Sequence, residues 1–393
     1  MILICATAPA VAQDQAETPG SFLFAWLKDN DGEDPAFLAV IDSDPGSPGY
    51  GKLLTTTPTG LPLRDAHHTP HQLPVNGRLF ANAFRDGQTF IYDISQTHLP
   101  RLTGSFETVD GFSYPHSFVE LDSGNFLVTF QSSGEANDQV GGLLELDPDG
   151  ELVRAASAAA PAVTDFIRPY SLEVAPESDR VISSSADMWQ TQATEHVQLW
   201  RLSDLALLDT IALPEGERRN IQQIPLEIRL LGDGSSAYVS TWNCGLYHLT
   251  GTTGNALAAE LVWDFASTAC AIPLRIGNYW IQAVGEAHQL VVLDISDPAV
   301  PQLATVRQLA EGFQPHWIAA EPGGNRIVLT GYQALSDRIV LLRWDDQLET
   351  LSIIDDFGEQ DGILPGFRTD RKIWPHGKTG EATAHGVMFW PPE

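Results

Sequence analysis

The chain has 393 residues, and its 22 Lys and Arg against 51 Asp and Glu give a net charge of -29. The acidic residues are scattered, so no basic face is available to neutralise phosphates, and the composition excludes nucleic acid and anionic membranes as partners. Beyond the N-terminal apolar run, no stretch approaches the roughly 20 apolar residues of a membrane span. Such an acidic surface attracts cations, although it is equally typical of a generally acidic proteome.

The N-terminus begins with a short apolar run that ends in Ala10-Val11-Ala12, the small-residue spacing of a secretory cleavage site. The basic region that usually precedes such a run is missing, so the run is either the end of a signal peptide or an apolar tail. We predict residues 1–12 to be a signal peptide remnant and residues 13–393 to be a single domain. Cleavage after Ala12 would leave Gln13 first, in a periplasmic or secreted protein.

Cysteine is rare in this chain. Cys5 lies in the predicted signal segment, which leaves Cys244 and Cys270. Two cysteines are too few for a disulfide scaffold and form no CxxC metal motif. They either bridge each other in an oxidising compartment or are two separate buried thiols.

Internal repetition is the most informative feature. Runs of four to eight Val, Ile, Leu, Phe and Trp residues alternate with Gly, Asp, Asn and Pro turns, which indicates an all-β chain. One unit recurs, in which a proline opens a strand and a turn leads to a second strand. It begins at Pro70, Pro115, Pro169, Pro225, Pro273 and Pro315, so that successive units are 45, 54, 56, 48 and 42 residues apart.

Repeats of this length with several strands each are typical of propeller blades. A further pair of strands, 22–26 and 36–42, precedes the first unit, and a remnant strand begins at His385. Because closure removes exposed sheet edges, we expect both ends of the chain to share a blade. The predicted fold is a seven-bladed β-propeller closed by its N- and C-terminal strands.

The residue after each repeated proline should lie near the central channel, because the first strand of a blade is innermost. The six residues are His71, His116, Tyr170, Leu226, Leu274 and His316. If His385 opens the closing blade, the histidines fall on four consecutive blades, and His67 and His68 add two imidazoles at the same end. Imidazole is a shared ligand of Cu, Zn, Fe and Ni, so we predict a metal site.

The predicted metal residues are His67, His68, His71, His116, His316 and His385. We expect His68, His116, His316 and His385 to be the ligands, and His67 and His71 to be alternates or residues that support the ligands. His376, in a Gly-rich loop, is a second-rank ligand or a lid residue. The sequence assigns no catalytic residue, and motifs for serine hydrolysis, nucleotide binding and zincin proteolysis are missing.

Two segments, DPAFLAVIDSDPGSPGYGKLL and IPLEIRLL, are specific enough to compare with known families. The first resembles the opening of the selenium-binding-protein family, and the second is similar to its IPLEIRFL segment. Members of this family include copper-dependent methanethiol oxidases. Weaker matches are HHTPHQLP, YPHSF, VQLWRL, LDISDP, DFGEQDG and AHG, so the resemblance spans most of residues 22 to 389. It implies that His67, His68, His116 and His385 match family histidines and act as metal ligands.

This chain also departs from the family pattern. Pro74 replaces the family cysteine that is linked with selenium binding, Val119 replaces a second histidine, and Gly386 replaces a glutamate. The family NWLHGD segment is replaced by AVGEAHQL, in which His288 is displaced by about one position. His71 and His316 are not expected from the family, so the site is rebuilt and selenium binding is not expected.

We therefore predict a periplasmic copper protein, with zinc or another divalent transition metal as the alternative. The resemblance implies an oxidase of methanethiol or a related small sulfur compound, which uses O2 and yields formaldehyde, hydrogen sulfide and hydrogen peroxide. The competing hypothesis is a non-catalytic metal-binding or scaffold propeller. A lactonase-like propeller would need carboxylate ligands near the channel, and the six inner positions above carry none. We expect a monomer.

Overall fold

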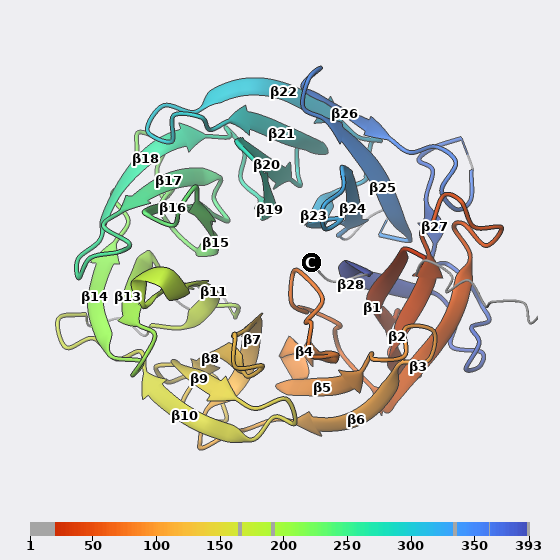
Figure 1. The fold of residues 1–393 in the computed structure, drawn as a ribbon, viewed down its shortest axis with the longest axis horizontal. Coiled ribbons are helices and arrows are strands. Elements are labelled where there is room, and N and C mark those ends of the chain that lie inside the picture. The colour runs from red at the N-terminus through yellow and green to blue at the C-terminus, as the bar shows by residue number, and fades with distance from the viewer. Residues whose placement is uncertain (1–19, 164–166, 190–192, 333–335, 361, 391–393) are drawn as a thin grey trace, which may run out of the picture.

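The computed structural model describes residues 20–163, 167–189, 193–332, 336–360 and 362–390, so the predicted signal segment 1–12 lies outside the described residues. The described chain forms strands and two short 3-10 turns, η1 (Phe84–Asp86) and η2 (Pro176–Ser178). None of its helical segments is long and apolar enough to span a membrane. The strands form seven blades around a common axis, which confirms the predicted fold (Figure 1).

Six blades follow the chain order, and their strands run from the axis to the rim unless noted. Blade 1 contains β4 (Arg78–Ala83), β5 (Gln88–Asp93) and β6 (Arg101–Phe106). Blade 2 contains β7 (Ser113–Glu120), β8 (Phe126–Ser132), β9 (Gly142–Leu146) and β10 (Leu152–Ser157). Blade 3 contains β11 (Pro169–Ala175), β12 (Arg180–Ser185), β13 (His196–Arg201) and β14 (Leu207–Ala212). Blade 4 contains β15 (Pro225–Leu231), β16 (Ser236–Thr241), β17 (Gly245–Thr250) and β18 (Ala258–Asp264). Blade 5 contains β19 (Cys270–Ile276), β20 (Tyr279–Val284), β21 (Gln289–Asp294) and β22 (Gln302–Gln308). Blade 6 contains β23 (Pro315–Ala320), β24 (Arg326–Gly331), β25 (Arg338–Asp345) and β26 (Thr350–Ile353), and the short β27 (Phe367–Arg368) also pairs with β25.

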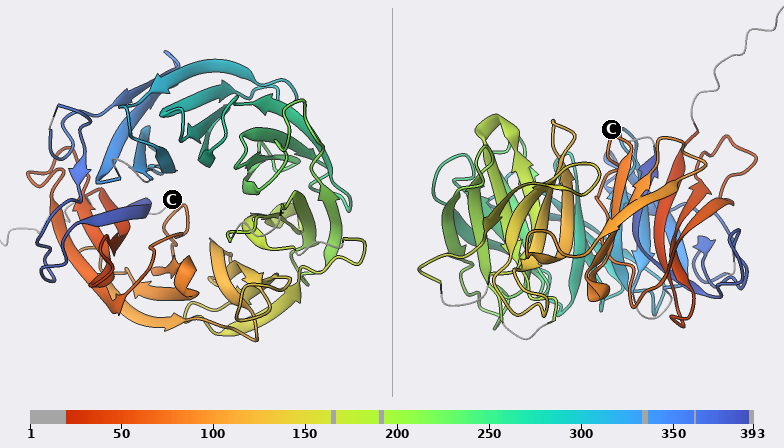
Figure 2. Two further views of the ribbon diagram at one scale, coloured as in Figure 1. Left: turned by 180° about the vertical axis from the view of Figure 1, so that it is seen from behind. Right: turned by 90° about the horizontal axis from the view of Figure 1, so that it is seen from below.

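The seventh blade joins the two ends of the chain, as predicted. It contains β28 (Ala382–Trp390), β1 (Phe22–Asp29), β2 (Pro35–Asp42) and β3 (Leu53–Pro62). The C-terminal β28 is innermost and pairs antiparallel with β1, with Phe22 opposite Trp390. Figure 2 shows the resulting closed ring from behind and edge-on. Closure leaves the first and last strands paired rather than exposed.

Burial explains why these segments form blades. The middle strands are apolar and covered on both faces, as in β21, whose four central residues are buried, whereas the outer strand β22 of the same blade is mostly exposed or half-buried. Large aromatic side chains such as Trp200 and Trp280 are fully buried within the blades. Burying one large apolar side chain contributes about 1.5 to 3 kcal/mol, so the packing between blades stabilises the ring.

Two of the six prolines that were predicted to open an inner strand do not do so. Pro70 lies in an irregular segment before β4, and Pro273 lies inside β19, where Cys270 occupies the place of the other prolines. Ala271, not Leu274, therefore stands at the level of His116. Each of the five complete inner strands β7, β11, β15, β19 and β23 carries a register shift just after this place. Such a bulge changes the direction in which the following side chains point, and a strictly alternating strand pattern did not predict this change.

The predicted innermost strand of blade 1 is replaced by the segment that contains His67 and His68. His67 donates its backbone N–H to the Asn82 carbonyl, and Asn82 donates its backbone N–H to the His68 carbonyl, both at 2.9 Å. In Figure 1 the orange chain leading into β4 reaches toward the ring axis. The segment thus occupies the inner edge of β4 without being a regular strand.

The two remaining cysteines form a disulfide. Cys244 lies in the turn between β16 and β17 of blade 4, and Cys270 begins β19 of blade 5. The bridge therefore ties two neighbouring blades together, which resolves the alternative that the sequence left open.

Candidate metal centre

Four consecutive blades bring histidines to one sector of the ring. His316 lies on β23 of blade 6 and His385 on β28 of blade 7. His67 and His68 lie on the inner edge of blade 1, and His116 lies on β7 of blade 2. The neighbouring inner strands converge on the axis, so residues far apart in the sequence meet there.

The six predicted metal residues lie in contact with one another. Ring centroids are 4.6 Å apart for His67 and His68, 4.5 Å for His67 and His385, and 4.1 Å for His68 and His116. His316 extends the cluster through His385 at 4.7 Å, and His71 approaches His68 at 6.1 Å. We call these six residues the histidine cluster. Within it, His67, His68 and His385 each offer a ligand atom within 4.8 Å of the other two.

The ring nitrogens of the cluster largely lack protein partners. Both ring nitrogens of His68 and of His385 are buried without a hydrogen bond, as are Nδ1 of His67, Nδ1 of His71 and Nε2 of His116. A buried polar atom without a partner costs on the order of 1 to 3 kcal/mol. A bound cation would offset this cost, so the donor set fits a metal ion.

The cluster is built to hold neutral imidazoles. Burial lowers the pKa of His67, His68 and His385 well below the usual range, and neighbouring histidines lower it further. Burial also lowers the pKa of His116 and of His316 to about 4. Neutral imidazole is the form that ligates metals, so these residues need no deprotonation step at neutral pH.

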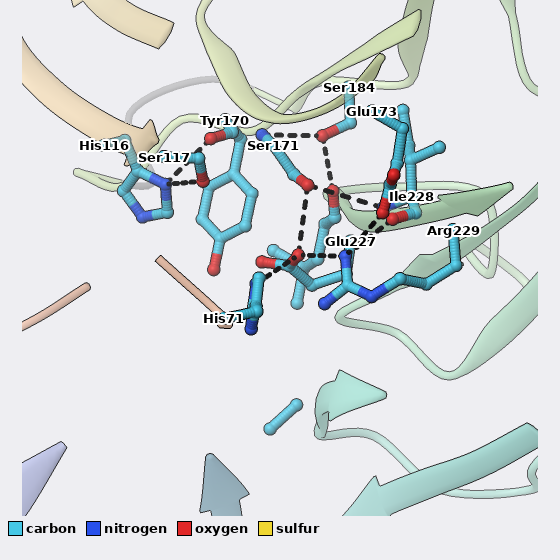
Figure 3. A network of polar contacts seen from close by, with 12 residues as sticks. His71, His116, Ser117, Tyr170, Ser171, Glu173, Ser184, Glu227, Ile228 and Arg229 are labelled. Carbon is cyan, nitrogen blue, oxygen red and sulfur yellow. Dashed lines mark hydrogen bonds and ion pairs between the residues drawn. The ribbon is translucent and has the colours of Figure 1, made fainter. Parts of the chain in front are cut away.

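His116 is oriented by the neighbouring blade. Its Nδ1 lies 2.8 Å from the Tyr170 carbonyl oxygen, to which it donates, and its ring packs on the Tyr170 ring at 3.9 Å. Because Nδ1 is used in this way, Nε2 is left facing the cluster. Figure 3 shows this contact beside the network around Glu227.

His71 belongs to a second group of potential ligands. Its Nε2 lies 3.1 Å from Glu227 Oε2, and its ring stacks on Trp317 at 4.6 Å. His68, His71 and Glu227 also offer three ligand atoms within 4.8 Å of one another. Glu227 is fully buried, and although burial would raise its pKa, His71 and Arg229 outweigh burial and hold the pKa below the usual range.

Glu227 is held by a polar network from three blades (Figure 3). Its Oε2 accepts hydrogen bonds from Ser171 Oγ at 3.0 Å and from Arg229 Nη1 at 2.9 Å. Arg229 also contacts Glu173 at 3.5 Å. Sequence reasoning missed Glu227, although a glutamate inside the apolar strand PLEIRLL was an available signal. The six inner positions that it considered carry no carboxylate, and Glu227 directly follows one of them, Leu226.

Asn82 fixes the irregular histidine segment. Its side chain is fully buried, accepts a hydrogen bond from the His68 backbone N–H at 2.6 Å and donates one to the Pro115 carbonyl at 2.7 Å. Asn82 therefore ties His68 to the blade that carries His116. On the other side, Gly386 packs so closely on Thr69 that a Cβ at 386 would lie 2.4 Å from Thr69 Oγ1. A glutamate does not fit at that position without a shift of Thr69.

A cavity of about 460 Å³ extends along the axis from the cluster and ends against His71. Its wall consists of residues 70–75 and of the parts of the inner strands β7, β11, β15, β19 and β23 that follow their bulges. Pro74 and Val119, which replace a family cysteine and a family histidine, both line it. Two of the departures from the family pattern thus lie in the cavity wall.

His376 does not join the histidine cluster. Its Nδ1 lies 2.7 Å from Thr56 Oγ1 and its Nε2 lies 2.8 Å from Thr379 Oγ1, so both ring nitrogens are occupied. The ring packs on Phe37 at 4.7 Å. These contacts give His376 a structural role rather than a ligand role. His288 contacts the Phe313 carbonyl through Nδ1 at 3.2 Å, in the connection between β20 and β21.

Comparisons with known proteins agree with the resemblance seen in the sequence. No protein-family model matches the chain. A methanethiol oxidase from a Hyphomicrobium species is 25% identical over 327 residues, which cover 76% of this chain and 72% of the relative. Selenium-binding protein 1 of Arabidopsis thaliana is 24% identical over 284 residues, which cover 63% of this chain and 54% of the plant protein.

Solved structures share the fold. A hypothetical selenium-binding protein from Sulfolobus tokodaii superposes with a TM-score of 0.73 at 15% identity, covering 95% of this chain and 94% of that chain. A periplasmic gluconolactonase from Pseudomonas aeruginosa superposes with a TM-score of 0.63 at 15% identity, covering 95% and 99%. At these identities the structural likeness concerns the propeller fold alone. The matches in sequence support a place in the selenium-binding protein and methanethiol oxidase family for this chain, as a divergent member.

Proposed function

We propose that this chain binds copper in the histidine cluster and oxidises a small sulfur compound with O2. The observation that carries the proposal is the set of buried, neutral imidazoles whose ring nitrogens lack protein partners. Imidazole suits several metals, but the match to a methanethiol oxidase favours a redox-active one. Zinc has no redox chemistry, so it fits the binding site but not an oxidase.

His67, His68 and His385 would hold the metal, and His116 presents Nε2 toward the same place. When bound, copper would lower the pKa of a substrate thiol and pass electrons to O2. The protein would contribute position and shielding. His71 is the member of the histidine cluster that lines the cavity, Glu227 fixes its ring through Nε2, and Trp317 covers the face of the ring.

In the reaction proposed from the family, one molecule each of methanethiol, dioxygen and water gives one each of formaldehyde, hydrogen sulfide and hydrogen peroxide. Carbon is oxidised, and dioxygen is reduced by two electrons. Copper-loaded protein given methanethiol in an oxygen electrode should consume dioxygen and release the three products in equal amounts. His385→Gln should abolish this consumption, whereas His376→Gln, outside the cluster, should retain it. Copper binding without dioxygen consumption would instead favour a metal-binding scaffold.

We also propose that the protein is exported. The Cys244–Cys270 disulfide supports this location, because disulfides persist in oxidising compartments. Mass spectrometry of the mature protein should find its first residue at or near Gln13. Intact Met1 on cytosolic protein would contradict export while leaving the copper proposal standing.

A further inference from the structure

The axial cavity has two chemically different ends. His71 forms the end next to the histidine cluster, and Arg275 on β19 lies in the wall toward the other end. Cys270 and Pro115 occupy equivalent places before the bulge of their strands, so Ala271 stands at the level of His116 and Arg275 follows four residues later. The bulge after Cys270 takes up one residue of this advance, so at about 3.3 Å per residue Arg275 begins about 10 Å farther along the channel than the level of His116.

Apolar side chains form part of the wall between the two ends. Leu172, Leu230, Leu274 and Ile318 contribute to it from four neighbouring blades. A volume of about 460 Å³ falls in the range of sites for ordinary small-molecule ligands and far exceeds the needs of methanethiol, which has two heavy atoms. The cavity therefore suits a longer molecule with a hydrocarbon middle.

The two arginines of the cavity wall differ in their partners. Arg229 is neutralised by Glu227 and also contacts Glu173. Arg275 donates to the Gly277 carbonyl at 3.1 Å, and within the described part of the chain no carboxylate forms an ion pair with it. A guanidinium has five N–H donors, so most donors of Arg275 remain available in a half-buried position.

The nearby acidic groups are already committed. Glu120 accepts the backbone N–H groups of Val75 and Asn76 at 2.7 and 3.0 Å. Burial raises the pKa of Glu173 to about 7, although Arg229 and, more weakly, Arg275 act to lower it, and the carboxyl contacts Arg229 rather than Arg275. In a chain with 51 acidic and 22 basic residues, an arginine without a carboxylate partner in a cavity wall is the group best placed to receive an anion.

We propose that the cavity binds a short aliphatic thiol that carries a carboxylate or sulfonate at its far end, with the anion on Arg275 and the thiol toward His71. The placement of the thiol near His71 rests on the proposed oxidase function. The placement of the anion on Arg275 does not, because it follows from the cavity and the charges alone.

Matched probes separate the two ends by calorimetry at constant ionic strength. The probes are 3-mercaptopropane-1-sulfonate, the neutral 3-mercapto-1-propanol, and propane-1-sulfonate, which lacks the thiol. The wild-type protein should bind the mercaptosulfonate at least about tenfold more tightly than the mercaptoalcohol, the usual scale for a charge-assisted contact. Propane-1-sulfonate should bind the metal-free protein, so this arm does not depend on copper.

Arg275→Gln should reduce the preference for the anion to about one, and Arg275→Lys should retain part of it. Arg343→Gln is the matched control, because Arg343 is exposed on β25, lies outside the cavity wall and carries the same charge. Equal binding of anionic and neutral thiols by the wild type, or an equal loss in Arg343→Gln, would overturn the inference. Oxidation of methanethiol by a protein that binds no anion would overturn this inference and leave the oxidase standing. Anion binding by a protein that takes up no copper when copper is supplied would overturn only the oxidase.

Discussion

Replacing Asn82 with alanine should weaken both the fold and the metal site. Asn82 Oδ1 accepts the His68 N–H, and Asn82 Nδ2 donates to the Pro115 carbonyl, all in the fully buried interior. The change leaves two buried backbone groups without partners, at about 1 to 3 kcal/mol each. We expect the free energy of unfolding to fall by about 2 to 6 kcal/mol. Copper affinity should fall about 10- to 100-fold, the usual cost of losing a residue that orients a ligand.

Gln282→Ala provides the matched control. Gln282 is also a fully buried amide on the second strand of a blade, and its Nε2 donates to the Ala271 carbonyl at 2.6 Å. Ala271 stands at the level of His116 on a blade that carries no cluster histidine, so this change should lower stability without lowering copper affinity. Urea unfolding gives the first quantity, and competition with a copper chelator gives the second. Wild-type affinity in Asn82→Ala, or an equal loss in Gln282→Ala, would refute the reasoning.

Three further predictions follow from the buried groups. The folded-state pKa of His116 and of His316 is about 4, below the ordinary value of 6.5. Their contribution to the free energy of unfolding is therefore complete above pH 6.5 and is lost as the pH falls toward 4. For His116 this loss is on the order of 3 kcal/mol in the metal-free protein, and an unchanged pH slope in His116→Gln would contradict it. Reducing the Cys244–Cys270 bridge, which spans 26 residues, should lower the free energy of unfolding by about 3.5 kcal/mol in denaturant titrations, and no change would argue against its role. His376→Ala should lower the free energy of unfolding by about 1 to 2 kcal/mol and leave the copper content unchanged. A loss of copper in this variant would show that His376 is a metal ligand.

The fold was largely predictable because repetition is visible in a single sequence. Four units begin with a proline that opens an inner strand or lies close to its start. In blade 5 Cys270 takes that place, and the visible proline comes three residues later. The closing blade was predictable because a ring without exposed edges requires the two ends to pair. The inner segment of blade 1 was not, because its conformation is set by the backbone and side chain of Asn82 rather than by a strand pattern.

The site was predictable in part. The same place on consecutive blades brings His316, His385 and His116 together, and this follows from the repeat alone. The argument from strict alternation made His67 and His71 mere alternates, but neither lies in a regular strand, so alternation does not govern them. Glu227 was missed because its contact with His71 crosses 156 residues of sequence.

Copper analysis with electron paramagnetic resonance tests the central claim most directly. Protein purified from copper-supplemented cells should contain stoichiometric copper, and the oxidised Cu(II) spectrum should show hyperfine coupling to several imidazole nitrogens. His68→Ala and His385→Ala should lose most of the metal, and His116→Ala and His316→Ala should lower the metal content greatly, whereas His376→Ala should keep it. Copper at background level in the wild type, or full copper occupancy in His68→Ala and His385→Ala, would contradict a copper centre in the histidine cluster.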